Sequence, residues 1–162
     1  MHSQQKQNGI TLGKNDVVSS TKKLKEENSS LFAKEGRILL VDDEMDIVKL
    51  YKHGLRRDGF EVEAFNDPEM ALSHFKPDAY DLAILDIRMP KMNGFELYRE
   101  MRKRDEKIRI CFMTAFEMHL KEFEKVLPSI KVDGLLTKPI HIVDLCSTVQ
   151  RLLNNSNSRD KT

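Results

Sequence analysis

Three acidic residues in this chain of 162 residues stand at the ends of apolar runs, where a carboxylate is unexpected. Asp42 and Asp43 directly follow the run RILLV (37–41), and Asp86 ends the run LAIL (82–85). Such runs fill strands buried on both faces of a sheet, where an unpaired charge is costly. Carboxylates that share a cavity raise one another's pKa or recruit a hard divalent cation such as Mg²⁺. The three acids are therefore candidate ligands of a magnesium site.

A hydroxyl and an amine follow two later apolar runs. Thr114 comes directly after IRICFM (108–113), and Lys138 comes shortly after the run at 132–136. Individually, acids and threonines are also typical helix caps or turn residues, and most lysines are solvated loop charges. Together these residues follow separate apolar runs in order along the chain, which favours one shared site.

Apolar runs alternate with helical stripes of apolar residues from residue 36 onward, and the pattern predicts five strand-helix units. The predicted strands span 37–41, 61–65, 82–86, 108–113 and 132–136. The predicted helices end at Gly59 and near Phe75, and then span 95–104, 116–127 and 142–152.

Strands that alternate with helices are joined by right-handed crossovers and form a mostly parallel sheet covered on both faces. We therefore predict an α/β domain with an open, doubly wound, five-stranded parallel sheet, because half a barrel would leave an apolar face unburied. In such sheets the ligand lies beyond the carboxyl ends of the strands, where the strand order reverses. If the first and third strands are adjacent, Asp42, Asp43 and Asp86 share one cavity.

Composition predicts the domain boundaries. Residues 1–35 are rich in Gln, Asn, Ser and Lys and cannot bury enough apolar surface to offset their ordering entropy, so we predict a disordered tail. Residues 36–153 form the predicted domain, and 154–162 is predicted to be a frayed C-terminus. Cys111 and Cys146 stand among apolar neighbours, which indicates reduced core thiols rather than a disulfide or a metal pair.

Charge and hydropathy exclude several classes of function. The formal net charge is +1, from 27 basic and 26 acidic side chains, so no basic surplus supports nucleic-acid binding. No apolar run reaches the roughly 18 to 20 residues that cross a bilayer, and the start MHSQQKQNG lacks the apolar core of a signal peptide. We therefore expect a cytoplasmic protein with neither a membrane nor direct nucleic acid among its partners.

The segments LLVDDE, LDIRMPKMNGFEL, MTA and LLTKP, in this order, closely resemble the receiver domain of two-component response regulators. The resemblance covers about residues 36–153. It implies a (βα)5 flavodoxin-like sheet with strand order 2-1-3-4-5, in a signalling protein that catalyses only its own phosphorylation and dephosphorylation. Because the chain ends soon after the last predicted helix, we expect a stand-alone receiver without an output domain, which signals by protein contact or phosphoryl relay.

The resemblance also implies the role of each acid. Asp86 would accept a phosphoryl group from a histidine kinase or a histidine phosphotransfer protein, and would itself contact the required Mg²⁺. Asp43 and the backbone carbonyl of Arg88 would bind the cation directly, and Asp42 would act mainly through metal-bound water. A cis peptide bond before Pro139 is expected in the same site.

The same resemblance places Thr114 and Lys138 on the phosphoryl oxygens, the first as a hydrogen-bond donor and the second as an ion-pair partner. Elementary chemistry supports these roles, because a carboxylate attacks phosphorus only when its charge and that of the phosphate are both screened, here by Mg²⁺ and an ammonium. The new dianion would then move the nearby loops and the following helix, and so convert a covalent event into a signal.

The expected docking surface for a downstream protein consists of the helix 116–127, the strand 132–136 and the helix 142–152. Leu135 on this surface departs from the family, which often has Tyr or Phe there. We therefore expect the visible conformational change in the segment that follows Thr114, with little change at the strand of Leu135.

Two alternatives stay open. A Mg²⁺-dependent phosphatase of the haloacid dehalogenase type also uses a strand-end aspartate nucleophile, but it usually carries a second acid two residues on, where this chain has Arg88. The other alternative is a receiver-like module that binds its partner without phosphorylation, against which the intact set of site residues argues.

Overall fold

The computed structural model describes residues 36–115 and 128–154. In chain order the elements in these ranges are β1 (Arg37–Val41), α2 (Met45–Arg57), β2 (Glu61–Phe65), α3 (Pro68–His74), β3 (Leu82–Asp86), α4 (Gly94–Arg104), β4 (Arg109–Thr114), β5 (Gly134–Thr137) and α6 (Ile142–Asn154). None of these helices is long and apolar enough to cross a membrane. The helix predicted at 116–127 and the two predicted terminal tails, apart from Asn154, lie outside the described residues.

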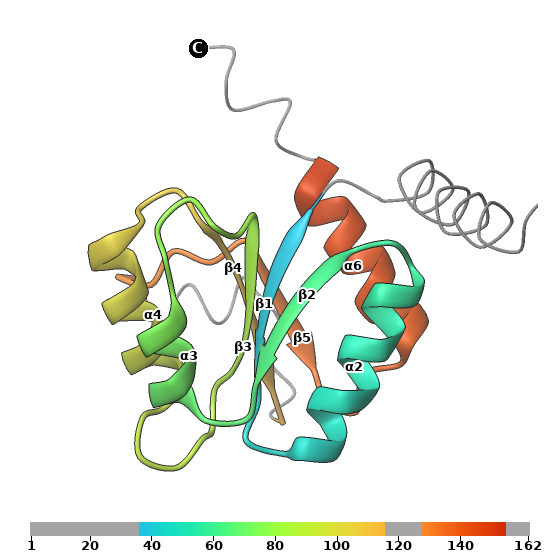
Figure 1. Cartoon of the computed structure of the whole chain (residues 1–162), viewed down its shortest axis with the longest axis horizontal. Coiled ribbons are helices and arrows are strands. Elements are labelled where there is room, and N and C mark those ends of the chain that lie inside the picture. Colours follow the sequence, from blue (N-terminus) through green and yellow to red (C-terminus); the bar gives the residue numbers. More distant parts are fainter. Residues whose placement is uncertain (1–35, 116–127, 155–162) are drawn as a thin grey trace, which may run out of the picture. The chain divides into compact units, whose positions relative to one another are not determined.

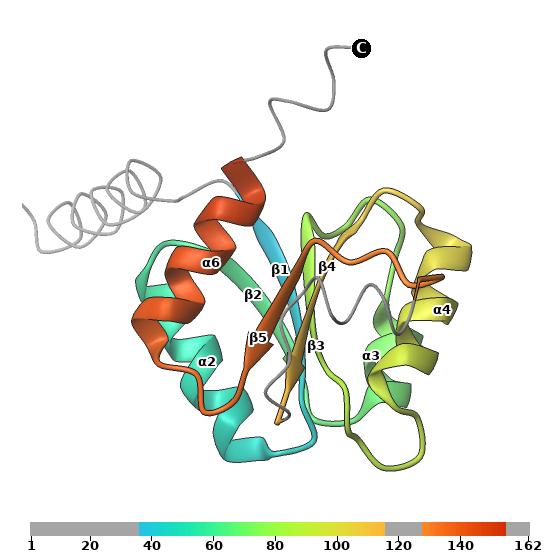
Figure 2. The ribbon, with the colours of Figure 1, turned by 180° about the vertical axis from the view of Figure 1, so that it is seen from behind.

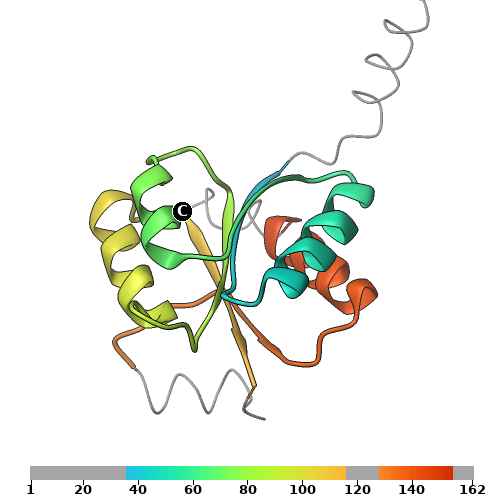
Figure 3. The same cartoon turned by 60° about the horizontal axis from the view of Figure 1, so that its bottom comes forward.

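The five strands form one parallel sheet in the order β2-β1-β3-β4-β5, which confirms the predicted fold class and strand order. Helices α2 and α6 cover one face, and α3 and α4 cover the other (Figure 1 and Figure 2). Figure 3 shows the sheet between these two helix pairs. Along β1, Ile38 and Leu40 join the core cluster beneath α2 and α6, whereas Leu39 and Val41 join the cluster beneath α3 and α4. Burial on both faces explains why β1, β3 and β4 are mainly apolar, whereas the edge strand β2 carries exposed Glu61 and Glu63.

β4 and β5 differ from the prediction at both ends. β4 is Arg109–Thr114 rather than 108–113, and β5 is Gly134–Thr137 rather than 132–136. Asp133 accounts for the later start of β5, because its amide donates to the Ile110 carbonyl at 2.7 Å and its carboxylate accepts the Ile110 amide at 2.9 Å. The Asp133 side chain thus replaces a backbone acceptor at the start of the β4–β5 ladder. Regular backbone pairing begins at Gly134.

The predicted ends of the first two helices, at Gly59 and near Phe75, are confirmed, since α2 ends at Arg57 and α3 ends at His74. α2 ends shortly before Gly59, whose φ of 98° is open to glycine at little cost. The Asp67 side chain accepts the amides of Glu69 and Met70 and so caps α3, with Pro68 in the first turn. Gly59 thus marks where the chain leaves α2 for β2, and Asp67 marks where it leaves β2 for α3.

The two cysteines occupy core positions, as predicted. Cys111 and Cys146 both lie in the buried cluster beneath α2 and α6. Burial raises the pKa of Cys111 to about 12, so this thiol stays protonated at neutral pH. The cysteines therefore contribute to packing rather than to the chemistry of the strand ends.

A buried carboxylate that the sequence did not single out ties together the opposite end of the sheet. Asp105, directly after α4, accepts the Asp78 amide at 3.0 Å, the Lys107 amide at 2.8 Å and the Ile108 amide at 3.1 Å. Burial raises the pKa of Asp105, but these amides and Arg102 outweigh it and hold the pKa below its ordinary value. Asp105 therefore joins the segment before β3 to the turn before β4.

Replacement of Asp105 by alanine is expected to lower the free energy of unfolding by about 2–4 kcal/mol at neutral pH, because buried amides lose their acceptor. The folded-state pKa lies below the unfolded one, so this contribution is present above the unfolded pKa and is lost as the pH falls through the folded pKa. Urea denaturation at neutral pH and in acid measures both effects. Asp46→Asn, at an exposed acid, is the control. A stability difference that stays undiminished in acid would contradict the assignment.

Candidate functional site

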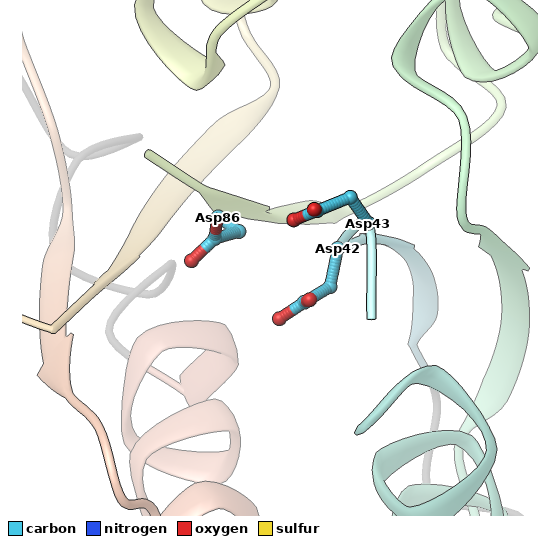
Figure 4. Close-up of side chains that lie close together, drawn as sticks. All are labelled: Asp42, Asp43 and Asp86. Atoms are coloured by element: carbon cyan, nitrogen blue, oxygen red, sulfur yellow. The ribbon is translucent and has the colours of Figure 1, made fainter. Parts of the chain in front are cut away.

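The three acids predicted from the sequence lie together at the carboxyl ends of β1 and β3 (Figure 4). The two strands pair in parallel with Val41 opposite Leu85, so the residues that end or follow them meet at one edge of the sheet. Carboxylate oxygens of Asp42, Asp43 and Asp86, one from each, all lie within 4.8 Å of one another. Asp42 and Asp86 are buried and Asp43 is half-buried, so most of this negative charge is withheld from solvent.

Lys138, which follows β5, supplies positive charge to these acids. Its ammonium lies 2.7 Å from Asp42 Oδ2, 2.9 Å from Asp86 Oδ1 and 3.6 Å from Glu44 Oε1. The lysine side chain is only 16% exposed, which excludes the interpretation as a solvated loop charge. The peptide bond between Lys138 and Pro139 is cis, as predicted. Lys138 therefore bridges the ends of β1 and β3 by charge.

Burial and neighbouring charges act in opposite directions on Asp86. Burial raises the pKa of Asp86 most, Lys138 lowers it, and Asp42 and Asp43 raise it, so the pKa lies above its ordinary value. Burial lowers the pKa of Lys138, but Asp42 and Asp86 outweigh it and raise the pKa above its ordinary value. The lysine is therefore a permanent cation at physiological pH.

The ends of β4 and β5 place Thr114 and Lys138 beside each other. Thr114 pairs with Thr137, and the Lys138 amide donates to the Thr114 carbonyl at 2.7 Å, so the pairing continues to the lysine. Thr114 is buried, and the residue before it, Met113, is in register with Asp86. The structure thus brings the predicted threonine, lysine and acids to the same edge of the sheet.

The donor set at this edge fits a hard divalent cation. Asp42 Oδ2 is buried and has no directed hydrogen-bond partner in the part of the chain that the structure describes, although the Lys138 ammonium lies 2.7 Å away as an ion pair. Several carboxylate oxygens in one place are the ligands that Mg²⁺ prefers. Arg88, whose carbonyl the sequence prediction adds, lies two residues beyond Asp86 in the segment 87–93 between β3 and α4.

Helix capping is only part of the role of the first acid. Asp42 Oδ1 accepts the Glu44 amide at 2.9 Å, immediately before α2. Glu44 itself is the N-cap residue of α2 and forms no side-chain cap. Its carboxylate is instead the third one near Lys138, a contact to which the sequence analysis gave no role.

The helix at 95–104 was predicted, but the cap at the start of α4, directly behind the acid on β3, was not. Asn93 accepts the amides of Phe95 and Glu96, and the Glu96 side chain accepts the Asn93 amide, which makes a capping box. The sequence signal was available in the spacing Asn-x-x-Glu. The close packing of Gly94 against the backbone of Asp86 has no such signal beyond the glycine itself.

Known proteins of one family match this chain. The model of the response regulator receiver domain matches residues 38–150. The alkaline phosphatase synthesis transcriptional regulatory protein PhoP of Bacillus subtilis is 34% identical over 121 residues, which are 74% of this chain and 49% of PhoP. The response regulator receiver protein CpdR of Brucella abortus is 29% identical over 72% of this chain and 96% of CpdR. The chain thus spans about half the length of several curated relatives, PhoP among them, and nearly all of CpdR.

Solved structures agree with the sequence matches. The chemotaxis protein CheY4 of Vibrio cholerae has a TM-score of 0.64 and 29% sequence identity, over 74% of this chain and 100% of CheY4. A CheY-like receiver domain protein of Methanospirillum hungatei has a TM-score of 0.66 and 27% identity, over 75% of this chain and 95% of that one. The family match includes all the strand ends that carry the site. The chain therefore belongs to the response regulator receiver domains of two-component systems, which are phosphoacceptor signalling proteins.

Proposed function

We propose that Asp86 is the phosphoacceptor of this receiver domain, in a reaction that depends on Mg²⁺. The observation that carries the proposal is a buried carboxylate at the end of β3, held 2.9 Å from a lysine ammonium and beside two further acids. β3 is the middle strand of the sheet, between the β1 acids and the β4 threonine. Asp86 therefore lies between the acids of β1 on one side and Thr114 and Lys138 of the β4 and β5 ends on the other.

The residues of the chain have separate tasks in the proposed transfer. An Asp86 oxygen forms the new bond to phosphorus while the bond from phosphorus to the donor's imidazole nitrogen breaks, and that nitrogen keeps the electron pair. The Lys138 ammonium neutralises charge first on the carboxylate and then on the phosphoryl oxygens. Thr114 donates a hydrogen bond to another phosphoryl oxygen. Since both residues are tied to the ends of neighbouring strands, they are positioned before the phosphoryl group arrives.

The proposed direct ligands of the cation are Asp43, Asp86 and the Arg88 carbonyl, and Asp42 would act mainly through metal-bound water. Mg²⁺ bound there would screen the charge of the acceptor and of the phosphoryl group. Asp42 and Asp43 hold the ligand oxygens beside Asp86 because β1 and β3 are paired strands. Arg88 also occupies the place where a haloacid dehalogenase phosphatase would carry its second acid, so that alternative is not favoured.

The proposed phosphodonor is a histidine kinase or a histidine phosphotransfer protein, and the proposed location is the cytoplasm. Output through protein contact or phosphoryl relay would use the face of segment 116–127, β5 and α6. On β5, Leu135 is half-buried, packs with the core cluster beneath α3 and α4, and pairs with Phe112. This packing supports the prediction that β5 itself changes little on phosphorylation.

Incubation with acetyl phosphate and Mg²⁺ is expected to add one phosphoryl group, because one carboxylate has the ammonium, the acids and the threonine around it. Intact-mass measurement should show a single addition that survives acid and is lost in base, as an acyl phosphate requires. Chelation of Mg²⁺ should prevent the addition. Labelling that proceeds equally well without the cation, or at several sites, would overturn the proposed function.

Millimolar Mg²⁺ is expected to raise the melting temperature, because a cation that binds only the folded state stabilises that state. At a Mg²⁺ concentration ten times the Kd, the stabilisation is about 1.4 kcal/mol. Asp43→Asn should remove most of this rise, and it should stabilise the metal-free protein slightly by relieving repulsion. Differential scanning fluorimetry with and without Mg²⁺ measures both. Asp46→Asn should keep the full rise. If Asp43→Asn responds to Mg²⁺ as the parent does, Asp43 is not a direct ligand.

A further inference from the structure

α4 begins in unusually close contact with the backbone of the proposed phosphoacceptor. A Cβ atom on Gly94 would lie 2.3 Å from the carbonyl oxygen of Asp86, and 3.0 Å from its carbonyl carbon and from Ile87 Cα. The φ of Gly94 is outside the left-handed region, in contrast to Gly59. Conformational freedom therefore does not explain the glycine at position 94. The glycine is explained by the lack of room for a Cβ atom beside the Asp86 peptide.

The helix side of this contact is held in place. The capping box of Asn93 and Glu96 fixes the first turn, with bonds of 3.0 Å to the Glu96 amide and 2.8 Å to the Asn93 amide. Leu97 and Met101 of the same helix are fully buried in the core cluster beneath α3 and α4. α4 cannot withdraw from β3 without opening this core.

The strand side of the contact is held as well. The Ile87 amide donates to Met113 of β4 at 2.9 Å, and the Ile87 carbonyl accepts the Gly94 amide at 3.0 Å. The Asp86 carboxylate contacts Lys138 from the adjacent part of the site at 2.9 Å. The peptide between Asp86 and Ile87 is thus enclosed between α4 and β4.

We infer that Gly94 is a positioning residue for phosphoryl transfer, because its lack of a side chain sets where the Asp86 carboxylate lies relative to Lys138 and the β1 acids. The inference rests on the proposed function of Asp86. An alanine at this position would force the contact with the Asp86 oxygen to open from 2.3 Å to at least 3.0 Å. A misplacement on the order of 1 Å can slow a positioned reaction by about 100-fold.

Gly94→Ala is expected to slow labelling by acetyl phosphate at least about tenfold and to weaken Mg²⁺ binding, measured at a temperature where the variant is folded. The Mg²⁺ affinity, from titration of the unlabelled protein, is a readout that lost stability alone would not change. Gly134→Ala is the matched control. Its Cβ would meet side-chain atoms of Cys111 and Leu152 at 3.0 Å, at the end of β5 away from Lys138. It should lose stability yet label within about twofold of the parent.

The outcomes separate this inference from the proposed function. If the parent itself is not labelled, the proposed function fails; if the parent is labelled and folded Gly94→Ala matches its rate and Mg²⁺ affinity, the inference alone fails. Should Gly94→Ala not fold, Asn93→Ala loosens the same helix end by removing its cap. A labelling rate of folded Asn93→Ala reduced about two- to fivefold supports the inference, and an unchanged rate overturns it.

Discussion

Asp86→Asn is expected to abolish labelling by acetyl phosphate while leaving the protein folded. The amide has the size and shape of the carboxylate, so the packing at the end of β3 is preserved, but its oxygen carries no charge with which to attack phosphorus. Removal of one buried negative charge also reduces the repulsion with Asp42 and Asp43, while Lys138 keeps its pair with Asp42 at 2.7 Å. The expected loss of labelling is therefore chemical rather than structural.

Intact-mass measurement after incubation with Mg²⁺ and acetyl phosphate detects this loss, and circular dichroism verifies the fold. Asp46→Asn makes the same change at an exposed acid in the first turn of α2 and should label as the parent does. Phosphoryl addition to Asp86→Asn at the parental rate would show that another carboxylate is the acceptor.

Lys138→Met is expected to lower the free energy of unfolding by about 3 kcal/mol near pH 8 and to slow labelling severely. The methionine keeps most of the length of the side chain but leaves Asp42 and Asp86 buried without their ammonium, which is the costly way to break a buried ion pair. Mg²⁺ should restore part of the lost stability, since a cation among the same oxygens replaces some of the missing charge.

The stability lost in Lys138→Met should depend on pH. Burial already raises the pKa of Asp86, and removal of the lysine takes away the main opposing charge, so the folded-state pKa rises further. Protonation of such a group stabilises the fold, so the deficit shrinks as the pH falls through the folded pKa toward the unfolded value of about 3.9. In the parent, the pKa of Lys138 is raised, so the lysine contributes its full stabilisation near pH 8 and in acid. This stabilisation is lost only in alkali.

Urea denaturation near pH 8 and near pH 4.5 measures this dependence. The matched control is Lys103→Met, at an exposed lysine that pairs with Glu100 at 2.5 Å within α4. An exposed pair of this kind contributes at most about 1 kcal/mol, so the control should change stability little at either pH. An equal deficit for Lys138→Met at both pH values would contradict the assigned role of the ammonium.

The positions of the site residues were predictable because they follow from topology. Alternating strands and helices require a parallel sheet, and the carboxyl ends of parallel strands meet at one edge. Asp42, Asp86, Thr114 and Lys138 could therefore be assigned to one site from their places after apolar runs. The strand order was predicted from the family resemblance and is confirmed.

The contacts within the site were less predictable, because they depend on side-chain conformation and close packing. The bridge from Lys138 to Asp42 and Asp86, with Glu44 at 3.6 Å, follows from how a flexible lysine settles among buried acids. The requirement for Gly94 depends on the distance between α4 and β3, which no periodicity encodes. The role of Asp105 was not predictable either, because the amides that donate to it come from two separate segments of the chain.

The order of the site residues along the chain has a consequence for synthesis on the ribosome. The acids of β1 emerge first, Asp86 follows, and Lys138 emerges last, after β5. A nascent chain that ends before β5 would hold carboxylates near one another without the ammonium that pairs with them, so its partial sheet would be poorly stable. Docking of the final strand would complete both the fold and the charge balance. A product truncated before β5 would thus lack both the last strand and the lysine that pairs with Asp42 and Asp86.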